Sequence, residues 1–73
     1  MGVRPSRHAK NELRRLRATR QEVESVVENP IRKDFDDKGN ALYFGYVASA
    51  PVWIVVADDD PDVIITVFEE GRR

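Results

Sequence analysis

The 73-residue sequence predicts an α+β domain in which two N-terminal helices pack on a four-stranded antiparallel β-meander, in the order ααββββ. Three observations favour this fold. Apolar residues recur at helical spacing up to Pro30, aromatic and β-branched residues dominate the chain beyond it, and the later segments are joined by short turns. Because short turns join antiparallel neighbours, we expect a meander. We assign one domain to residues 1–73, with an ordered core over about 6–68 and a frayed tail over 69–73.

The first helix is expected over residues 6–17. Ser6 follows a proline and precedes the helical pattern, as an N-cap residue does. One narrow apolar stripe then recurs at i, i+4 and i+7, formed by Ala9, Leu13 and Leu16. The basic residues of this segment fall outside the stripe, so we expect them to face solvent or a ligand.

The second helix is expected over residues 19–28. Thr19 and Glu22 have the spacing of a capping box, in which each side chain satisfies a free backbone N–H of the other residue. The buried face of this helix is expected to consist of Val23, Val26 and Val27. The helix should end at Asn29, because the residue before a proline is driven out of the α region.

Four strands are expected from Ile31 onward, over residues 31–35, 41–47, 52–57 and 63–68. Turns rich in Asp, Gly and Asn separate them. Alternation places Leu42, Phe44 and Tyr46 on one face of the second strand, opposite Tyr43, Gly45 and Val47. In the last strand it predicts that Ile64, Thr66 and Phe68 share a face. The alternation alone does not identify which set meets the helices.

The charges are divided unevenly along the chain, although the net charge is only −1. Residues 1–20 contain seven basic residues and one acidic residue, whereas residues 21–73 contain five basic and twelve acidic ones. Such a block gives the first helix a local positive field. It is also consistent with a solvated helix face, and the acidic remainder argues against a large polynucleotide footprint.

Several kinds of chemistry are excluded by composition. The chain has no cysteine and a single histidine, His8, so it has no disulfides, thiolate chemistry, cysteine-based zinc site or multi-histidine metal site. We expect no metal and no cofactor. No apolar run approaches the ~20 residues of a membrane span, so we expect a cytoplasmic protein without a membrane partner.

An ordered set of short motifs resembles a group of small bacterial domains of poorly defined function. The set comprises Ser6-Arg7-His8-Ala9, Thr19-Arg20-Gln21-Glu22-Val23, Glu28-Asn29-Pro30, Lys38-Gly39-Asn40 and Ile64-Ile65-Thr66-Val67. More distantly, this group is similar to RelE-like toxins and the barnase–EndoU–colicin–RelE ribonuclease fold. The resemblance implies a metal-independent endoribonuclease of a toxin–antitoxin pair, with RNA and an antitoxin-like protein as partners.

The resemblance also implies site residues. His8 matches the family's histidine in the first helix, and Thr66 matches the threonine of its last strand. Glu12 and Leu16 occupy positions where related domains commonly carry arginines. Cleavage through the RNA 2′-hydroxyl needs an acid–base pair and donors for the phosphate. We therefore predict His8, Thr66 and Glu12 as catalytic residues. The predicted RNA- and phosphate-binding residues are Arg7, Arg14, Arg17, Lys33 and Tyr43, and Trp53 or Tyr46 is expected to stack on a base.

Two other functions remain open from the sequence. The same scaffold can serve as a catalytically silent protein-binding module that uses an apolar surface or an edge strand. A homodimer with a role in assembly would also fit, since a chain this short buries only a modest core. His8 can equally be an exposed histidine, Thr66 an ordinary strand residue, and the aromatic residues part of the core or its rim. The ribonuclease is distinguished by His8, Arg14 and Lys33 converging on one open sheet face.

Overall fold

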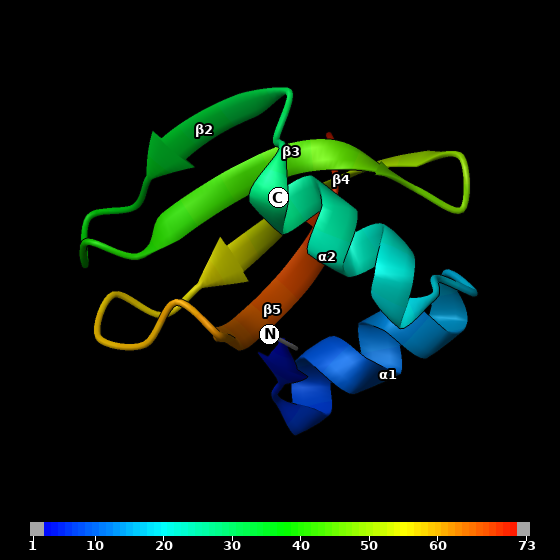
Figure 1. Ribbon diagram of the computed structural model, residues 1–73, viewed down its shortest axis with the longest axis horizontal. Helices are drawn as coiled ribbons and strands as arrows, with labels where there is room; N and C mark the ends of the chain where they lie inside the picture. The colour runs from blue at the N-terminus through cyan, green and yellow to red at the C-terminus, as the bar shows by residue number, and fades with distance from the viewer. Residues whose placement is uncertain (1–2, 72–73) are drawn as a thin grey trace.

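The computed structural model describes residues 3–71 as two helices and a five-stranded mixed sheet (Figure 1). The helices are α1 (Arg7–Arg15) and α2 (Arg20–Glu28). The strands are β1 (Arg4–Pro5), β2 (Arg32–Phe35), β3 (Ala41–Val47), β4 (Ala50–Val56) and β5 (Val63–Glu69). The α+β class predicted from the sequence is therefore confirmed.

The prediction of a purely antiparallel four-stranded meander is wrong in one respect. The strand order is β1-β5-β4-β3-β2, and β1 pairs in parallel with β5 through Arg4–Val63 and Pro5–Ile64. The other four strands form the expected antiparallel meander. A strand of two residues is too short to show alternation in the sequence. The pairing of β1 with β5 depends on hydrogen bonds to residues near the other end of the chain. The Arg4 N–H, for example, donates to the Asp62 carbonyl.

Both helix starts agree with the sequence prediction. The Ser6 hydroxyl accepts from the Ala9 N–H at 3.1 Å and caps α1. The capping box of α2 is formed in both directions between Thr19 and Glu22. Asn29 is the C-cap of α2, as expected before Pro30. The helix α1 ends earlier than residue 17, because Arg17 adopts a left-handed backbone with φ of 60°.

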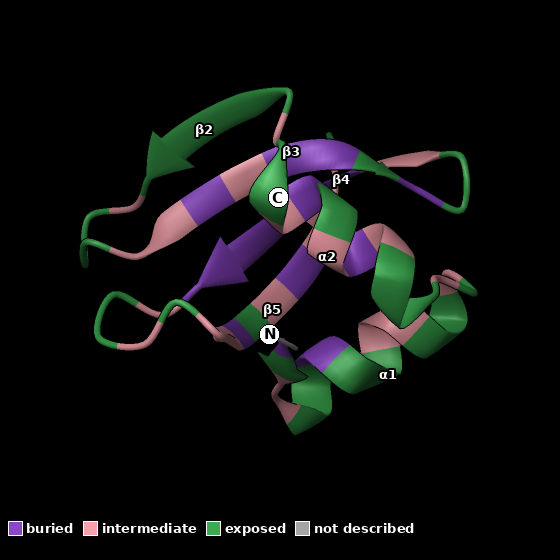
Figure 2. Ribbon diagram, in the orientation of Figure 1, coloured by how far each residue is buried: buried purple, intermediate pink, exposed green. Residues whose placement is uncertain are grey.

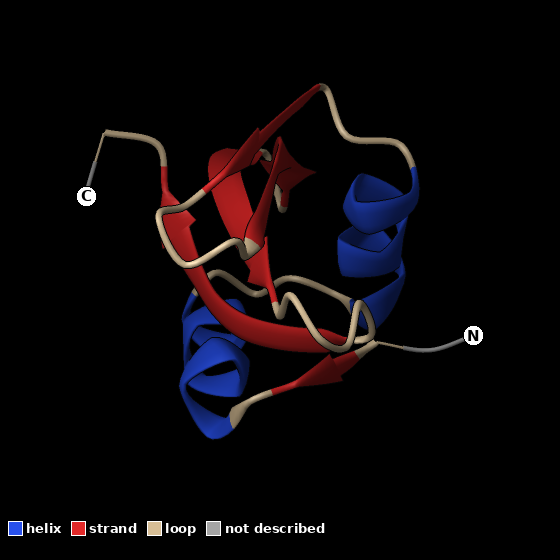
Figure 3. Cartoon of the chain, turned by 90° about the vertical axis from the view of Figure 1, so that its left-hand side faces the viewer, coloured by secondary structure: helices blue, strands red, loops and turns tan. Residues whose placement is uncertain are grey.

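The two helices cover one face of the sheet, with α1 against β5 and α2 against β3 (Figures 1 and 3). The main core between them and the sheet is formed by Val3, Ala9, Val23, Val26, Val47, Val52, Ile54, Val56, Ile64 and Val67. Gly45 lies where α2 crosses β3, so closely that a Cβ there would come within 2.7 Å of Val26. The helix-facing set of β3 is thus Tyr43, Gly45 and Val47, with Leu42, Phe44 and Tyr46 on the open face.

A second, smaller apolar cluster lies on the open face of the sheet, formed by Leu42, Phe44, Trp53 and Val55 with Phe68 packed beside them. No helix of the described chain covers it. The Arg32 guanidinium lies over the rings of Phe44 and Trp53, at 5.8 and 5.6 Å from their centroids. This cation covers part of the cluster, whose side chains are buried despite the missing helix layer (Figure 2).

The alternation predicted for the last strand is wrong at its start. Val56 pairs with Ile64 and Val55 with Thr66, so Ile65 is an extra residue at a β-bulge. As a result Ile64 and Val67 both face the helices, while Thr66 and Phe68 face the open side.

The tail also differs from expectation. Glu69 belongs to β5, and the Glu70 N–H donates to the Pro51 carbonyl, so both residues are held; residues 72–73 lie outside the described residues.

Candidate functional site

The start of α1 is attached to β5 by Ser6. Its backbone N–H donates to the Ile64 carbonyl at 2.8 Å, and its hydroxyl donates to the Ile65 carbonyl at 2.6 Å. The same hydroxyl oxygen accepts from the Ala9 N–H. One side chain therefore both caps the helix and anchors it at the bulge of β5, which fixes the position of the residues that follow.

From this anchor α1 runs beside the second half of β5. The far end of the helix is tied to the strand by Arg15, whose guanidinium lies 3.3 Å from the Glu69 carboxylate. Nine helical residues rise about 13.5 Å and four strand residues about 13 Å, so the two segments match in length. The helix therefore runs parallel to β5, from the bulge at Ile65 toward Glu69.

His8, Glu12 and Arg15 share one flank of α1, since residues at i, i+4 and i+7 lie on one side of a helix. Glu12 and Arg15 line a shallow hollow whose other wall is Phe68 and Glu69 of β5. His8 is exposed one helical turn before this hollow. Thr66 is half-buried and faces the side of the sheet opposite to the helices. Of the three predicted catalytic residues, His8 and Glu12 thus share one flank of α1, whereas Thr66 lies on the open face of β5. We call this flank of α1 together with the hollow the α1–β5 seam and define it by His8, Glu12, Arg15, Phe68 and Glu69.

Among residues 3–71, the Arg15 guanidinium lies between two carboxylates of the α1–β5 seam. The Arg15 guanidinium contacts Glu12 at 3.0 Å and Glu69 at 3.3 Å. The hydrogen bonds that Arg15 donates to the carboxylates of Glu12 and then Glu69 raise the pKa of Arg15 above its ordinary value. Arg15 is therefore a fixed positive charge, and the bonds that its Nε and Nη2 donate to the two Glu12 carboxylate oxygens hold that carboxylate in place.

Arg15, Phe68 and Glu69 were not among the residues predicted from the sequence. Arg15 has a detectable signal, because it is three residues beyond Glu12 and seven beyond His8 on the same helix. Glu69 has none, since its role depends on β5 extending one residue into the expected tail. Phe68 follows from the bulge, which turns it toward the open face.

The predicted phosphate-binding arginines are exposed along the outer surface of α1 and just after it. Arg7, Arg14 and Arg17 have no ion-pair partner among residues 3–71. Arg7 precedes His8 directly. Arg14 lies on the other flank of α1, where it borders a groove between α1 and α2. These cations surround the solvent side of α1 rather than pointing into the seam.

Lys33 and Tyr43 are not brought together with His8. They form a cross-strand pair between β2 and β3, with the Lys33 Nζ 5.5 Å from the centroid of the Tyr43 ring. Tyr43 shares a row with Ile54 and Val67 on the helix-facing side, but there α2 packs against β3, whereas α1, which carries His8, packs against β5. Three strand spacings also separate β2 from β5. The expected convergence of His8, Arg14 and Lys33 on one open face is therefore absent.

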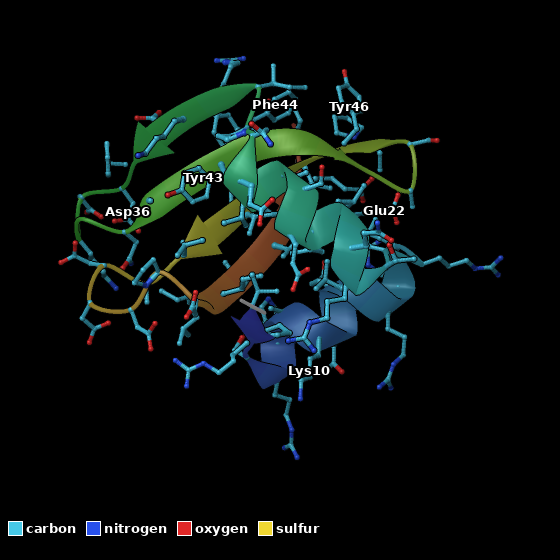
Figure 4. All side chains as sticks on the ribbon, viewed as in Figure 1. Lys10, Glu22, Asp36, Tyr43, Phe44 and Tyr46 are labelled. Carbon is cyan, nitrogen blue, oxygen red and sulfur yellow. The ribbon has the colours of Figure 1, made fainter. Side chains whose placement is uncertain are left out.

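The two residues expected to stack on a base differ in accessibility. Trp53 is buried, and its indole N–H donates to the Glu70 carboxylate at 2.9 Å. Tyr46 is 56% exposed and meets Phe44 edge-on, with ring centroids 5.9 Å apart. Figure 4 shows Phe44 and Tyr46 on the side of the molecule away from Lys10 of α1. Of the two, only Tyr46 presents its ring to solvent.

The described residues contain no group of three His, Asp or Glu side chains that could hold a metal ion. Within residues 3–71, no helix is long and apolar enough to cross a membrane. Fold and site together define a small α+β domain with a mixed sheet and an ionised seam between its first helix and last strand. No family model matches the chain, and searches of curated proteins and of solved structures found nothing similar to it.

Proposed function

We propose that this domain is a metal-independent endoribonuclease that cleaves RNA through the 2′-hydroxyl at the α1–β5 seam. The observation that carries the proposal is the alignment of His8, Glu12 and Arg15 on one flank of α1, where Glu12 and Arg15 line a hollow with Phe68 and Glu69 of β5. This set combines two groups able to transfer protons with a fixed cation, at the surface of the domain.

In the proposed reaction, the Glu12 carboxylate accepts the proton of the 2′-hydroxyl. The 2′-oxygen attacks the phosphorus, and the bond between phosphorus and the 5′-oxygen breaks. Protonated His8 gives its proton to the leaving 5′-oxygen, which yields a 2′,3′-cyclic phosphate and a free 5′-hydroxyl. Glu12 ends protonated and His8 neutral, so the step is balanced and water restores both groups.

The remaining residues supply binding. Arg15 holds Glu12 in place and adds positive charge at the seam. Arg7 lies next to His8 and carries no ion pair within the described chain, so it is the arginine best placed to contact a flanking phosphate. Phe68 gives the seam an apolar side for a sugar or base.

The first experiment is induction of the chain in a bacterial host, with His8→Ala beside it and total RNA taken from both cultures. Arrested growth with fragmented RNA, both abolished by His8→Ala, is the expected result. Normal growth and intact RNA, with soluble and folded protein in the cells, would overturn the ribonuclease.

The second experiment uses purified protein, EDTA and an oligoribonucleotide. We expect 2′,3′-cyclic phosphate ends, and no cleavage next to a 2′-deoxynucleotide. Loss of one acid–base group should slow cleavage by about 10²–10⁴-fold, so His8→Ala and Glu12→Gln are the test variants. Asn11→Ala is the matched control, because Asn11 is exposed on the same helix, outside the seam. Equal rates for all three variants would show that the activity lies elsewhere.

One observation favours the catalytically silent protein-binding module as a second candidate. A groove between α1, α2 and the N-terminal strand has an apolar floor, formed by Val3, Pro5, Leu13, Ala18 and Val23. Three cations border it, namely Lys10, Arg14 and Arg20. Such a groove fits an apolar protein segment that carries acidic residues. This candidate predicts a folded protein that leaves RNA intact and binds such a peptide, and that loses the peptide on Arg14→Glu.

A further inference from the structure

The strand β2 is an open edge of the sheet. It is the outermost strand of the order β1-β5-β4-β3-β2, and all four of its residues are exposed (Figures 1 and 2). Two large apolar side chains stand at its ends, since Ile31 and Phe35 are each 61% exposed. Exposed apolar residues beside an unpaired strand are characteristic of a surface that pairs with another strand.

The hydrogen-bonding groups at this edge follow from the β2–β3 hairpin. The Asp36 N–H donates to the Asn40 carbonyl, which makes these two residues a hydrogen-bonded pair. Bonded and non-bonded pairs alternate in an antiparallel ladder, so Asp34 and Arg32 also bond to β3. The backbone N–H and C=O groups of Lys33 and Phe35 therefore point away from the sheet. The Phe35 N–H is taken by the Asp34 carboxylate at 2.8 Å, which leaves the Lys33 pair open.

The charges on β2 are complementary to those of a second copy. If two β2 strands run antiparallel about a two-fold axis at Lys33, Arg32 of each copy lies opposite Asp34 of the other. These positions are non-hydrogen-bonded in the new ladder, where facing side chains are closest. To form the pair, the Arg32 guanidinium has to turn away from the Phe44 and Trp53 rings of its own chain, over which it lies. The same register sets the Phe35 side chain of each copy opposite Ile31 of the other, although the N–H groups of both residues bond within their own chain, that of Ile31 to the Phe44 carbonyl. A heterologous partner would need to supply these charges, whereas a second copy has them already.

The two facing lysines do not oppose this register strongly. On its own chain the Lys33 Nζ lies 5.4 Å from the Phe35 ring centroid and 5.5 Å from that of Tyr43. The aromatic faces thus hold each ammonium over its own sheet, to one side of the axis. We propose that this chain forms a homodimer by antiparallel pairing of β2 with β2, centred on Lys33, which joins two five-stranded sheets into one. The proposal does not depend on the ribonuclease, because the α1–β5 seam lies at the other edge of the sheet.

Two substitutions at position 33 test the backbone pairing. Lys33→Pro removes the N–H that would bond across the axis, and it leaves the β2–β3 ladder intact because that N–H points outward. Lys33→Ala keeps the N–H and removes the ammonium. We expect light scattering after size-exclusion chromatography to give twice the monomer mass for the wild type and Lys33→Ala, and the monomer mass for Lys33→Pro at the same concentration. A wild type that stays monomeric up to the highest soluble concentration would overturn the proposal, and so would a dimeric Lys33→Pro.

If Lys33→Pro does not fold, charge substitutions decide the question. Asp34→Arg places one guanidinium against that of Arg32 in the second copy and should dissociate the dimer, although it also frees the Phe35 N–H for pairing. The double variant Arg32→Asp with Asp34→Arg restores opposite charges and should recover the dimer. Trp53 fluorescence confirms that each variant is folded. A dimer unaffected by Asp34→Arg, or one that the double variant does not recover, would place the interface elsewhere.

Discussion

Among the single residues, Gly45 most directly sets the distance between a helix and the sheet. A Cβ at this position would lie 2.7 and 2.8 Å from the two Cγ atoms of Val26. Val26 belongs to the main core and Gly45 is buried beside it, so neither residue can move away without disturbing close-packed neighbours. The glycine is needed for the close approach of α2 to β3, and not for an unusual backbone conformation, because its φ is not positive.

The substitution Gly45→Ala should therefore destabilise the domain by overpacking, at a cost of about 1–3 kcal/mol. The free energy of unfolding can be measured by urea denaturation, followed by Trp53 fluorescence. Adding Val26→Ala removes the two colliding methyl groups, so the double variant should lose less stability than the sum of the two single variants. Simple additivity would show that the contact with Val26 is not the cause.

Glu22 joins two parts of the chain through one carboxylate. It accepts from the Thr19 N–H at 2.9 Å within the capping box, and from the Ala48 N–H at 2.8 Å in the β3–β4 turn. The hydrogen bonds from the Thr19 and then the Ala48 backbone lower the pKa of Glu22 below its ordinary value of 4.5. The sequence predicted the capping box but not the bond to Ala48, because that contact depends on how α2 lies across the sheet.

This lowered pKa makes stability depend on pH in a defined direction. A carboxyl group with a lower pKa in the folded state stabilises the fold above its unfolded pKa, and that contribution is lost as pH falls through the folded pKa. We expect the free energy of unfolding to fall as pH drops below about 4.5, and to fall less in Glu22→Gln. Glu28→Gln, on the exposed side of the same helix, should keep the wild-type pH dependence in urea titrations. Identical profiles for wild type and Glu22→Gln would contradict this assignment.

Among the secondary-structure elements, the β3–β4 hairpin is the most strained. Its two turn residues, Ala48 and Ser49, have φ values of 50° and 67°. A two-residue hairpin turn of this kind needs positive φ at both positions, which Asn and Gly adopt far more readily than Ala and Ser. The sequence marked this segment as a break between strands, but Ala-Ser carries no signal for so tight a turn.

Replacement of the turn by Ala48→Asn with Ser49→Gly should stabilise the domain, because each left-handed non-glycine residue costs on the order of 1 kcal/mol. The backbone N–H of residue 48 still reaches Glu22, so no contact is lost. The midpoint of thermal unfolding should rise. Ala50→Gly serves as the matched control, since it places a glycine in the adjoining strand and should lower the midpoint. A double variant no more stable than wild type would argue that the turn is unstrained.

The arrangement of the secondary-structure elements explains which parts of the site the sequence could and could not predict. Spacing on one helix was enough to group His8 with Glu12, because residues at i and i+4 share a flank. It was not enough to place Lys33, whose face depends on the register between β2 and β3. The bulge at Ile65 reversed the expected face of Ile64, since one inserted residue changes the alternation on one side of it. Long-range pairing leaves no local trace, and β1 was missed for the same reason.

At the scale of the whole molecule, stability is graded across the sheet. The centre of β4 is enclosed on both sides, with Val52, Ile54 and Val56 in the main core and Trp53 and Val55 in the open-face cluster. At one edge β1 and α1 cover β5, whereas β2 at the other edge is exposed throughout. Local opening at β2 therefore disrupts few buried contacts, while opening at β4 disrupts both clusters.

Native-state hydrogen exchange should reveal this gradient. In β4 the amides of Ile54 and Val55 should exchange only by global unfolding, so their exchange free energy should equal the value from urea denaturation and fall with urea at the same slope. The bonded amides of β2, those of Arg32 and Asp34, should exchange by local opening with little dependence on urea. The outward Lys33 amide should exchange fastest in dilute protein and become protected as protein concentration rises, because β2 pairing would bury it. Equal protection of β2 and β4 in dilute protein would contradict the gradient. A Lys33 amide that exchanges equally fast at every concentration would contradict the pairing while leaving the gradient intact.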